Sequence, residues 1–278
     1  MIQKFFSLLF LILWVVDCTQ KEEGFSEQDT LLLLLGLSDR AENYDRDVEV
    51  ISDRIVTTSY GSIVTYDLNT EAELSNYKNL LRVELEKYPR GYWIKAKAER
   101  VVLVKNLLVN GQLWSALPDP YQKTLFLSVN AGGLNDEYRI HVIHHELNHN
   151  MDFARLGDMK ATEQEWTLLN TNGFQYGNGG TSAYANPGIP WSALTNPQPG
   201  FVDLYSTLAQ EEDRSELVAI LLGVPAEYTT LQNICNTDPI VVSKVRQTRI
   251  NMKRFWPFAV GGDTFWKQRV SDVANICR

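Results

Sequence analysis

The sequence predicts an α+β fold with a mostly helical C-terminal half. An amphipathic helix over residues 71–88 is followed by Val- and Leu-rich segments at 100–108 and 124–129, which are typical of strands. A second helix is expected over residues 137–154. With 278 residues, 44% hydrophobic and 22% charged, the composition is that of an ordinary globular protein, which excludes wholesale disorder.

Charge and cysteine content exclude two classes of function. The 34 acidic and 26 basic residues give a net charge of −8, so no basic face is available to bind nucleic acid. Three cysteines are too few for a disulfide framework, and no CxxC pair indicates a cysteine-based metal site. At most one bridge, between Cys235 and Cys277, is considered, and the sequence gives no distance between them.

The N-terminal residues predict export. Lys4 precedes an apolar run over residues 5–16 that is broken only by Ser7, which is typical of a signal peptide. This run is shorter than the roughly 20 residues that a membrane-spanning helix needs. We therefore expect residues 1–17 to be a signal peptide.

Cys18 follows directly, and residues 15–18 resemble a bacterial lipobox, in which the cysteine becomes the lipidated first residue of the mature protein. Residues 18–23 resemble the acidic tether of lipoproteins at the surface of Bacteroidetes cells. This resemblance implies an outer-membrane lipid anchor at Cys18, a tether and approach segment over 18–47, and a folded domain over 48–278. A plain secretory signal whose cleavage site lies near a cysteine is the alternative.

The helix expected at 137–154 contains all four histidines of the chain, and residues 145–149 read His-Glu-Leu-Asn-His. His145 and His149 are one helical turn apart, so both imidazoles can bind one Zn²⁺. Glu146 points off that face, where its carboxylate can take a proton from a zinc-bound water. An amphipathic helix with solvated histidines is the alternative. His141 and His144 are expected to be structural.

A catalytic zinc takes three protein ligands, and the sequence has no histidine after the motif helix. The third ligand is therefore expected from the acidic cluster at 211–216, which begins a helix that runs through Leu222 and ends at Gly223. Glu212 and Glu216 are four residues apart on one face, so one can bind zinc while the other supports it. The alternative is an acidic first turn that the helix dipole favours.

Residues 171–199 are rich in Asn, Gly, Pro and Tyr and include Trp191, which predicts a long loop over the cleft. Its aromatic side chains are candidates for a substrate subsite, and an ordinary surface loop is the alternative. Two amphipathic helices, at 241–255 and 264–276, are expected to be packing elements.

Together these residues resemble the zinc-binding metallopeptidase lipoproteins of Bacteroidetes, the substrate-import-associated zinc metallohydrolases, which are distantly similar to the anthrax lethal factor catalytic domain. The resemblance runs over residues 71–222. The segments that carry it are 145–149, 166–170, 173–177, 200–205 and 212–216.

The resemblance implies a role for each matching residue. His145, His149 and Glu212 would hold zinc, and Glu146 would be the general base. Tyr205 would hydrogen-bond the oxyanion of the tetrahedral intermediate. Packing of Tyr205 on Phe201 is the alternative for that residue.

Two carboxylates, Glu216 and Asp152, are expected to support the zinc ligands from behind. The architecture implied is a zincin-like domain, in which a small twisted sheet lies over the motif helix. Its edge strand at 124–129 would pair with an extended peptide.

The function implied is a surface-anchored zinc peptidase of the Glu-ligand type that acts on peptide or protein substrates and associates with nutrient-uptake machinery. The alternative is a non-catalytic uptake lipoprotein with a structural zinc site. Glu146 favours the enzyme, because a structural site has no use for a general base.

Overall fold

The computed structural model describes residues 39–68, 72–131, 135–260, 262–271 and 276–277. The chain divides into two compact units, Met1–Asn43 and Tyr44–Arg278, and residues 39–43 are the part of the first unit that is described. The expected signal peptide and Cys18 lie outside the described residues. Among those that are described, no helix is both long enough and apolar enough to cross a bilayer.

The secondary structure follows the predicted order of helix, strands, motif helix and helical C-terminal half. The strands are β1 (Glu49–Ile51), β2 (Val64–Leu68), β3 (Arg100–Val109), β4 (Gln112–Leu113), β5 (Ala116–Asp119) and β6 (Thr124–Ser128). The α-helices are α3 (Ala72–Glu86), α4 (Tyr92–Lys95), α5 (Asp136–Leu156), α6 (Gln164–Thr167), α7 (Gln210–Leu222), α8 (Pro225–Cys235), α9 (Pro239–Phe255) and α10 (Phe265–Ser271). Short 3₁₀ helices are η1 (Ala41–Tyr44), η2 (Gly61–Ile63), η4 (Gly180–Ala185) and η5 (Tyr205–Thr207). The fold is a mixed α/β fold with one sheet and extensive helix.

The described strands form one sheet around β3. Strands β1 and β6 pair with β3 in parallel, while β2 and β4 pair with it in antiparallel fashion. Strand β5 pairs antiparallel to β6, which gives the order β1-β3-β6-β5. Strand β5 is therefore the edge strand at one end of this order.

The prediction that residues 124–129 form the edge strand is wrong. That segment is β6, which lies between β3 and β5, and all five of its residues are buried. A continuous apolar run is typical of a strand covered on both faces, so the sequence pattern was compatible with an interior position. The true edge strand, Ala-Leu-Pro-Asp, was missed because it is short and contains a proline.

Both faces of the sheet are covered by apolar side chains. In β6, and in β3 as far as Val104, odd-numbered residues face the helices and belong to the larger core, for example Val101, Leu103, Leu125 and Leu127. Even-numbered residues face the other way into a smaller core, for example Val102, Val104 and Phe126. This alternation is the period of two expected for strands.

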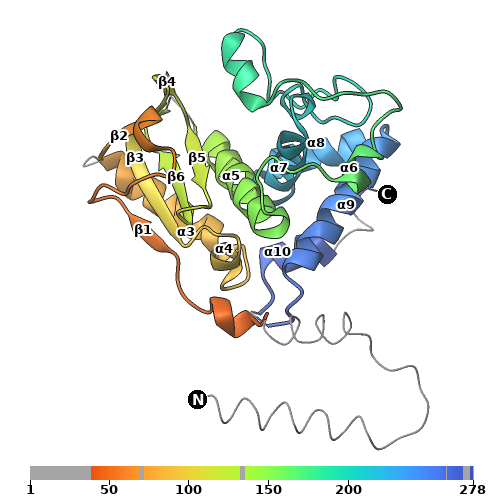
Figure 1. Ribbon diagram of the computed structural model, residues 1–278. Helices are drawn as coiled ribbons and strands as arrows, with labels where there is room; N and C mark the ends of the chain where they lie inside the picture. Colours follow the sequence, from red (N-terminus) through yellow and green to blue (C-terminus); the bar gives the residue numbers. More distant parts are fainter. Residues whose placement is uncertain (1–38, 69–71, 132–134, 261, 272–275, 278) are drawn as a thin grey trace, which may run out of the picture. The chain divides into compact units, whose positions relative to one another are not determined.

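Helix α5 lies between the sheet and the C-terminal helices (Figure 1), and it packs against α7 on one side and against β5 and α3 on others. Its start is capped by Asn135, whose side chain accepts the Tyr138 N–H at 2.9 Å. Its end is Gly157, at φ 82°, a left-handed conformation that glycine adopts without strain. The helix is therefore fixed at both ends.

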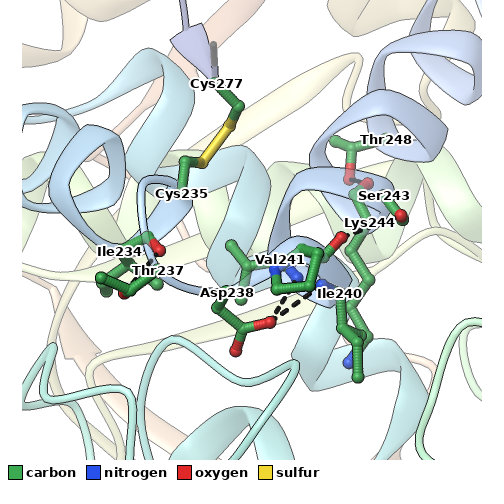
Figure 2. The surroundings of a disulfide bond; sticks show 11 residues. Ile234, Cys235, Thr237, Asp238, Ile240, Val241, Ser243, Lys244, Thr248 and Cys277 are labelled. Carbon is green, nitrogen blue, oxygen red and sulfur yellow. Dashed lines mark hydrogen bonds between the residues drawn. A yellow bond between two sulfur atoms is a disulfide. The ribbon is translucent and has the colours of Figure 1, made fainter.

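The C-terminal half is stabilised by a cap and a crosslink. Asp238 caps α9 by accepting the backbone N–H groups of Ile240 and Val241 (Figure 2). A disulfide joins Cys235, at the end of α8, to Cys277. The bridge that the sequence only allowed is thus present in the structure.

Candidate metal centre

The motif helix brings the two predicted histidine ligands together. His145 and His149 lie one turn apart on α5, and their Nε2 atoms are 3.1 Å from each other. Both side chains are buried. Two imidazole nitrogens at this distance point at a common position, which is the arrangement that a shared metal ion requires.

Helix α7 adds a carboxylate from the opposite side. Glu212 Oε2 lies 3.0 Å from His145 Nε2 and 3.4 Å from His149 Nε2. For a tetrahedral ion with bonds of about 2.0–2.1 Å, neighbouring ligand atoms are about 3.3 Å apart. The three donor atoms therefore have the spacing of three corners of such a site, and their chemistry suits a divalent ion.

The protonation of these groups indicates a site made for a cation. Burial alone would lower the pKa of His145, but the carboxylates of Glu212 and Glu216 raise it to about 10. Burial would raise the pKa of Glu212, but His149 and His145 lower it to about 2. The Glu212 carboxylate is thus negative at ordinary pH, and a metal ion would take the place of a proton among these donors.

Glu216 supports His145 from behind. Its Oε1 atom lies 2.9 Å from His145 Nδ1, the nitrogen that faces away from the other ligands. A carboxylate there favours a proton on Nδ1 and leaves the Nε2 lone pair for a metal. The structure thus places Glu212 at the donor cluster and Glu216 behind it, a distinction that the four-residue spacing could not make.

His141 extends this support to α8. Its Nδ1 is hydrogen-bonded to Glu227 Oε2 at 2.9 Å, and its Nε2 lies 3.2 Å from Glu216 Oε2. His141, His145 and Glu216 also form a second group with closely spaced donor atoms. Asp203 faces Glu216 as well, and burial together with that carboxylate raises the pKa of Asp203 well above its usual range. Neither Glu227 nor Asp203 was predicted as a site residue, although Asp203 lies in the 200–205 segment that carries the resemblance.

Ser215 lies behind the second ligand. Its Oγ is 3.5 Å from His149 Nδ1 and accepts a hydrogen bond from Asn148 at 3.1 Å. Both residues were missed as candidate site residues. Two features of the sequence could have indicated them: Ser215 directly precedes Glu216, and Asn148 lies within the HExxH segment.

His144 is structural, as predicted. Its two nitrogens are taken by the Tyr88 hydroxyl at 2.7 Å and by Glu84 at 2.6 Å. Lys87 pairs with Glu84 and donates to the carbonyl of Leu222 at 2.8 Å. The network ties α5 to the end of α7 and does not include the donor cluster.

Glu146 is not one of the three donor residues, but its carboxylate interacts electrostatically with them. Burial raises the pKa of Glu146 above its usual range, while His149 and His145 oppose that shift and Glu212 reinforces it. A carboxylate with a raised pKa beside a cation site has the property of a general base.

Tyr205 lies at the same centre. Its ring centroid is 5.8 Å from that of His145. An ideal Cβ on Gly180 would lie 2.3 Å from the Tyr205 hydroxyl and 2.2 Å from Glu212 Oε1, so both atoms face one glycine. Phe201, the alternative partner of Tyr205, packs on the rings of Phe174 and Tyr176. Burial, then Glu212, raises the pKa of Tyr205 well above its usual range, so its hydroxyl remains a donor.

Asp152 does not join the cluster. Its carboxylate accepts hydrogen bonds from Arg214 Nε at 2.6 Å and Arg155 at 2.8 Å. Arg214 belongs to α7, so this ion-pair network holds α5 and α7 together one turn beyond His149. The prediction that Asp152 supports a zinc ligand is therefore wrong, because Asp152 stabilises the pair of helices α5 and α7. Ser215 is the residue that approaches His149.

Comparison with known proteins identifies the fold. The chain is similar to the crystal structure of a candidate zinc-binding metallo-peptidase from Bacteroides caccae, with a TM-score of 0.51 and 18% identity. The alignment covers 91% of this chain and 97% of that one. Protein-family models and curated proteins give no match.

Proposed function

We propose that this chain is a zincin-like zinc metallopeptidase that hydrolyses peptide bonds. The observation that carries the proposal is the convergence of His145, His149 and Glu212 within 3.4 Å of one another, with Glu146 beside them. Two histidines and one carboxylate are the protein ligands of several catalytic zinc sites, which leave the fourth position open. The fold of the Bacteroides caccae protein supports the same class.

Each residue has a distinct task in this mechanism. A bound zinc supplies Lewis acidity and lowers the pKa of a water molecule. Glu146 would act as the general base that takes a proton from the attacking water and passes it to the leaving amine, for which its raised pKa suits it. The Tyr205 hydroxyl donates to the carbonyl oxygen of the scissile bond as negative charge develops there. Glu216 holds the imidazole of His145 in one tautomer.

Strand β5 is the edge at which an extended peptide would bind. Ser128 N–H donates to Ser115 C=O at 2.8 Å, so by alternation Ala116 and Pro118 direct their backbone groups away from β6. Pro118 has no N–H, and its carbonyl accepts the Tyr60 hydroxyl at 2.7 Å. Ala116 therefore directs its backbone groups to the edge side of β5, and the residue is itself buried.

The experiment that tests the enzyme is a peptide-library digest of the wild type beside Glu146→Gln, with zinc measured on both. We expect cleavage by the wild type alone and equal zinc in the two proteins, because Glu146 is not among the donor atoms. Equal cleavage by both would reveal a different catalytic centre.

The same digest distinguishes the peptidase from the second candidate, a non-catalytic uptake lipoprotein with a structural metal. That candidate has one observation in its favour, the burial of all three donor residues at 6–8% exposure. Zinc in both proteins with no cleavage of any peptide would support it.

We also propose export and anchoring by a lipid on Cys18 at the outer-membrane surface, where the enzyme would work beside nutrient-uptake machinery. The apolar run before Cys18 supports this. Labelled palmitate should enter the wild type in its host and be lost in Cys18→Ser. Labelling that survives the substitution would contradict the anchor.

A further inference from the structure

A 3₁₀ helix connects the metal centre to the edge of the sheet. Helix η4 begins at Gly180, which lies against Glu212 and the Tyr205 hydroxyl. Four residues later, the ring of Tyr184 stacks on Trp114, with centroids 5.7 Å apart and planes at 17°. Trp114 comes two residues before β5, the strand proposed to pair with the substrate. One short segment thus links the donor cluster to the substrate edge.

A second exposed ring, that of Tyr138, acts on Tyr184. Tyr184 is 42% exposed and Tyr138 is 38% exposed, so both rings are open to a binding partner. The Tyr138 hydroxyl lies 3.3 Å from Ser115 Oγ, which holds that ring at the same margin of the sheet. The surface formed by Trp114, Tyr138 and Tyr184 is called the aromatic patch below.

The patch lies within electrostatic reach of the reacting groups. Partial burial raises the pKa of Tyr184, and the next cause is the charge of Glu146, with Glu212 also contributing. Tyr184 is therefore a neutral phenol beside the proposed base. A substrate side chain on the patch would belong to a residue close to the scissile bond.

We propose that the aromatic patch is a subsite that binds an aromatic side chain of the substrate next to the scissile bond. This inference rests on the proposed peptidase function. An aromatic ring would extend the stack of Tyr184 on Trp114 and cover the exposed ring face. An acidic side chain is disfavoured by the carboxylates of Glu146 and Glu212, which act on Tyr184.

The specificity test uses the zinc-loaded full-length protein. The peptides are paired and differ only by Phe or Ala at the residue next to the scissile bond. The wild type should prefer the Phe peptide by roughly tenfold in kcat/KM. Trp114→Ala and Tyr184→Ala should reduce that preference to within about twofold, chiefly by slowing cleavage of the Phe peptide. Tyr184→Phe should keep the preference because it keeps the ring.

Leu168→Ala is the matched control, because Leu168 is a large apolar residue that is 74% exposed on a different element. It should retain the wild-type preference. Unchanged zinc content and circular dichroism in each variant exclude misfolding as the cause. A wild type without the preference, or alanine variants that retain it, would overturn the subsite.

A binding measurement separates this inference from the proposed function. Glu146→Gln, which cannot cleave, should bind the Phe peptide roughly tenfold more tightly than the Ala peptide, and Trp114→Ala in that background should abolish the difference. If no peptide is cleaved by the wild type but this binding difference exists, the peptidase proposal fails while the subsite stands. If cleavage occurs and the binding difference is absent, only the subsite fails.

Discussion

Glu212 and Glu216 lie one turn apart on α7, yet they approach different nitrogens of His145. Glu212 Oε2 is 3.0 Å from Nε2, whereas Glu216 Oε1 is 2.9 Å from Nδ1. In a site built on the Nε2 atoms, Glu212 would therefore bind the ion directly, and Glu216 would orient His145. The two substitutions should differ in kind as well as in size.

Glu212→Ala should remove bound zinc at ordinary concentrations, because it takes away one of three donors. Glu216→Ala should keep the site but weaken it by about 10- to 100-fold, which is typical of groups that orient a ligand. Competition with a fluorescent zinc chelator measures both affinities. Equal losses, or a greater loss in Glu216→Ala, would contradict these assignments.

Gly180 marks a place where the backbone must approach the centre closely. A Cβ there would lie 2.2 Å from Glu212 Oε1 and 2.3 Å from the Tyr205 hydroxyl, closer than nonbonded atoms approach. Gly180→Ala should therefore displace both side chains, weaken zinc binding and slow peptide cleavage by at least tenfold.

Gly188→Ala is the matched control for this prediction. A Cβ at Gly188 would meet no atom within 4 Å. It should leave zinc affinity and turnover unchanged. Wild-type zinc affinity in Gly180→Ala would show that Glu212 does not need its present position.

At the residue level, the sequence predicted the donors because the HExxH spacing is a property of the helix itself. His145, Glu146 and His149 need only an α-helix to face one position. Choosing between Glu212 and Glu216 needed the direction of α7 relative to α5, which no local pattern contains. The roles of Gly180 and Glu227 could not be predicted for the same reason, because their contacts join segments that are distant in sequence.

At the level of elements, α9 begins at a carboxylate with several partners. Asp238 accepts the N–H groups of Ile240 and Val241, and its other oxygen accepts from Gly200 N–H at 2.6 Å and Asn196 at 2.9 Å. Burial would raise the pKa of Asp238, but these donors lower it below its usual range. The carboxylate therefore ties the long loop to the start of α9.

Asp238→Asn should lower the free energy of unfolding by about 1 kcal/mol at neutral pH, because an amide NH₂ in place of Oδ2 cannot accept from Gly200 N–H and Asn196. A group with a lowered pKa stabilises the fold above its unfolded pKa of about 3.9 and loses that effect as pH falls through the folded pKa. The difference between wild type and variant should thus shrink only below about pH 4. Urea unfolding at several pH values checks this, and a difference that grows on acidification would contradict it.

Elements with a helical period or a long apolar run were predicted within a few residues, and several short elements were missed. Helix α5, expected at 137–154, spans Asp136–Leu156, and its caps extend it slightly. Strand β5 has four buried residues and no alternation, so neither its existence nor its edge position could be predicted. Strand order depends on pairing between distant segments, which explains the misplacement of β6.

At the level of the whole molecule, the disulfide between Cys235 and Cys277 closes a loop over a sequence separation of 42. The chain-entropy relation gives a stabilisation of about 4 kcal/mol for a loop of this size. The double variant Cys235→Ser, Cys277→Ser should lose up to that amount in denaturant unfolding, with zinc binding retained. Reduced wild-type protein should unfold like the variant, and equal stability of oxidised and reduced forms would contradict the prediction.

The central claim is that one zinc ion is held by His145, His149 and Glu212. A crystal structure of the zinc-loaded protein, with anomalous data at the zinc edge, tests it most directly. We predict one anomalous peak about 2.0–2.2 Å from an Nε2 atom of each histidine and from a Glu212 oxygen. A peak at the neighbouring group of His141, His145 and Glu216, or no peak at either group, would contradict the account.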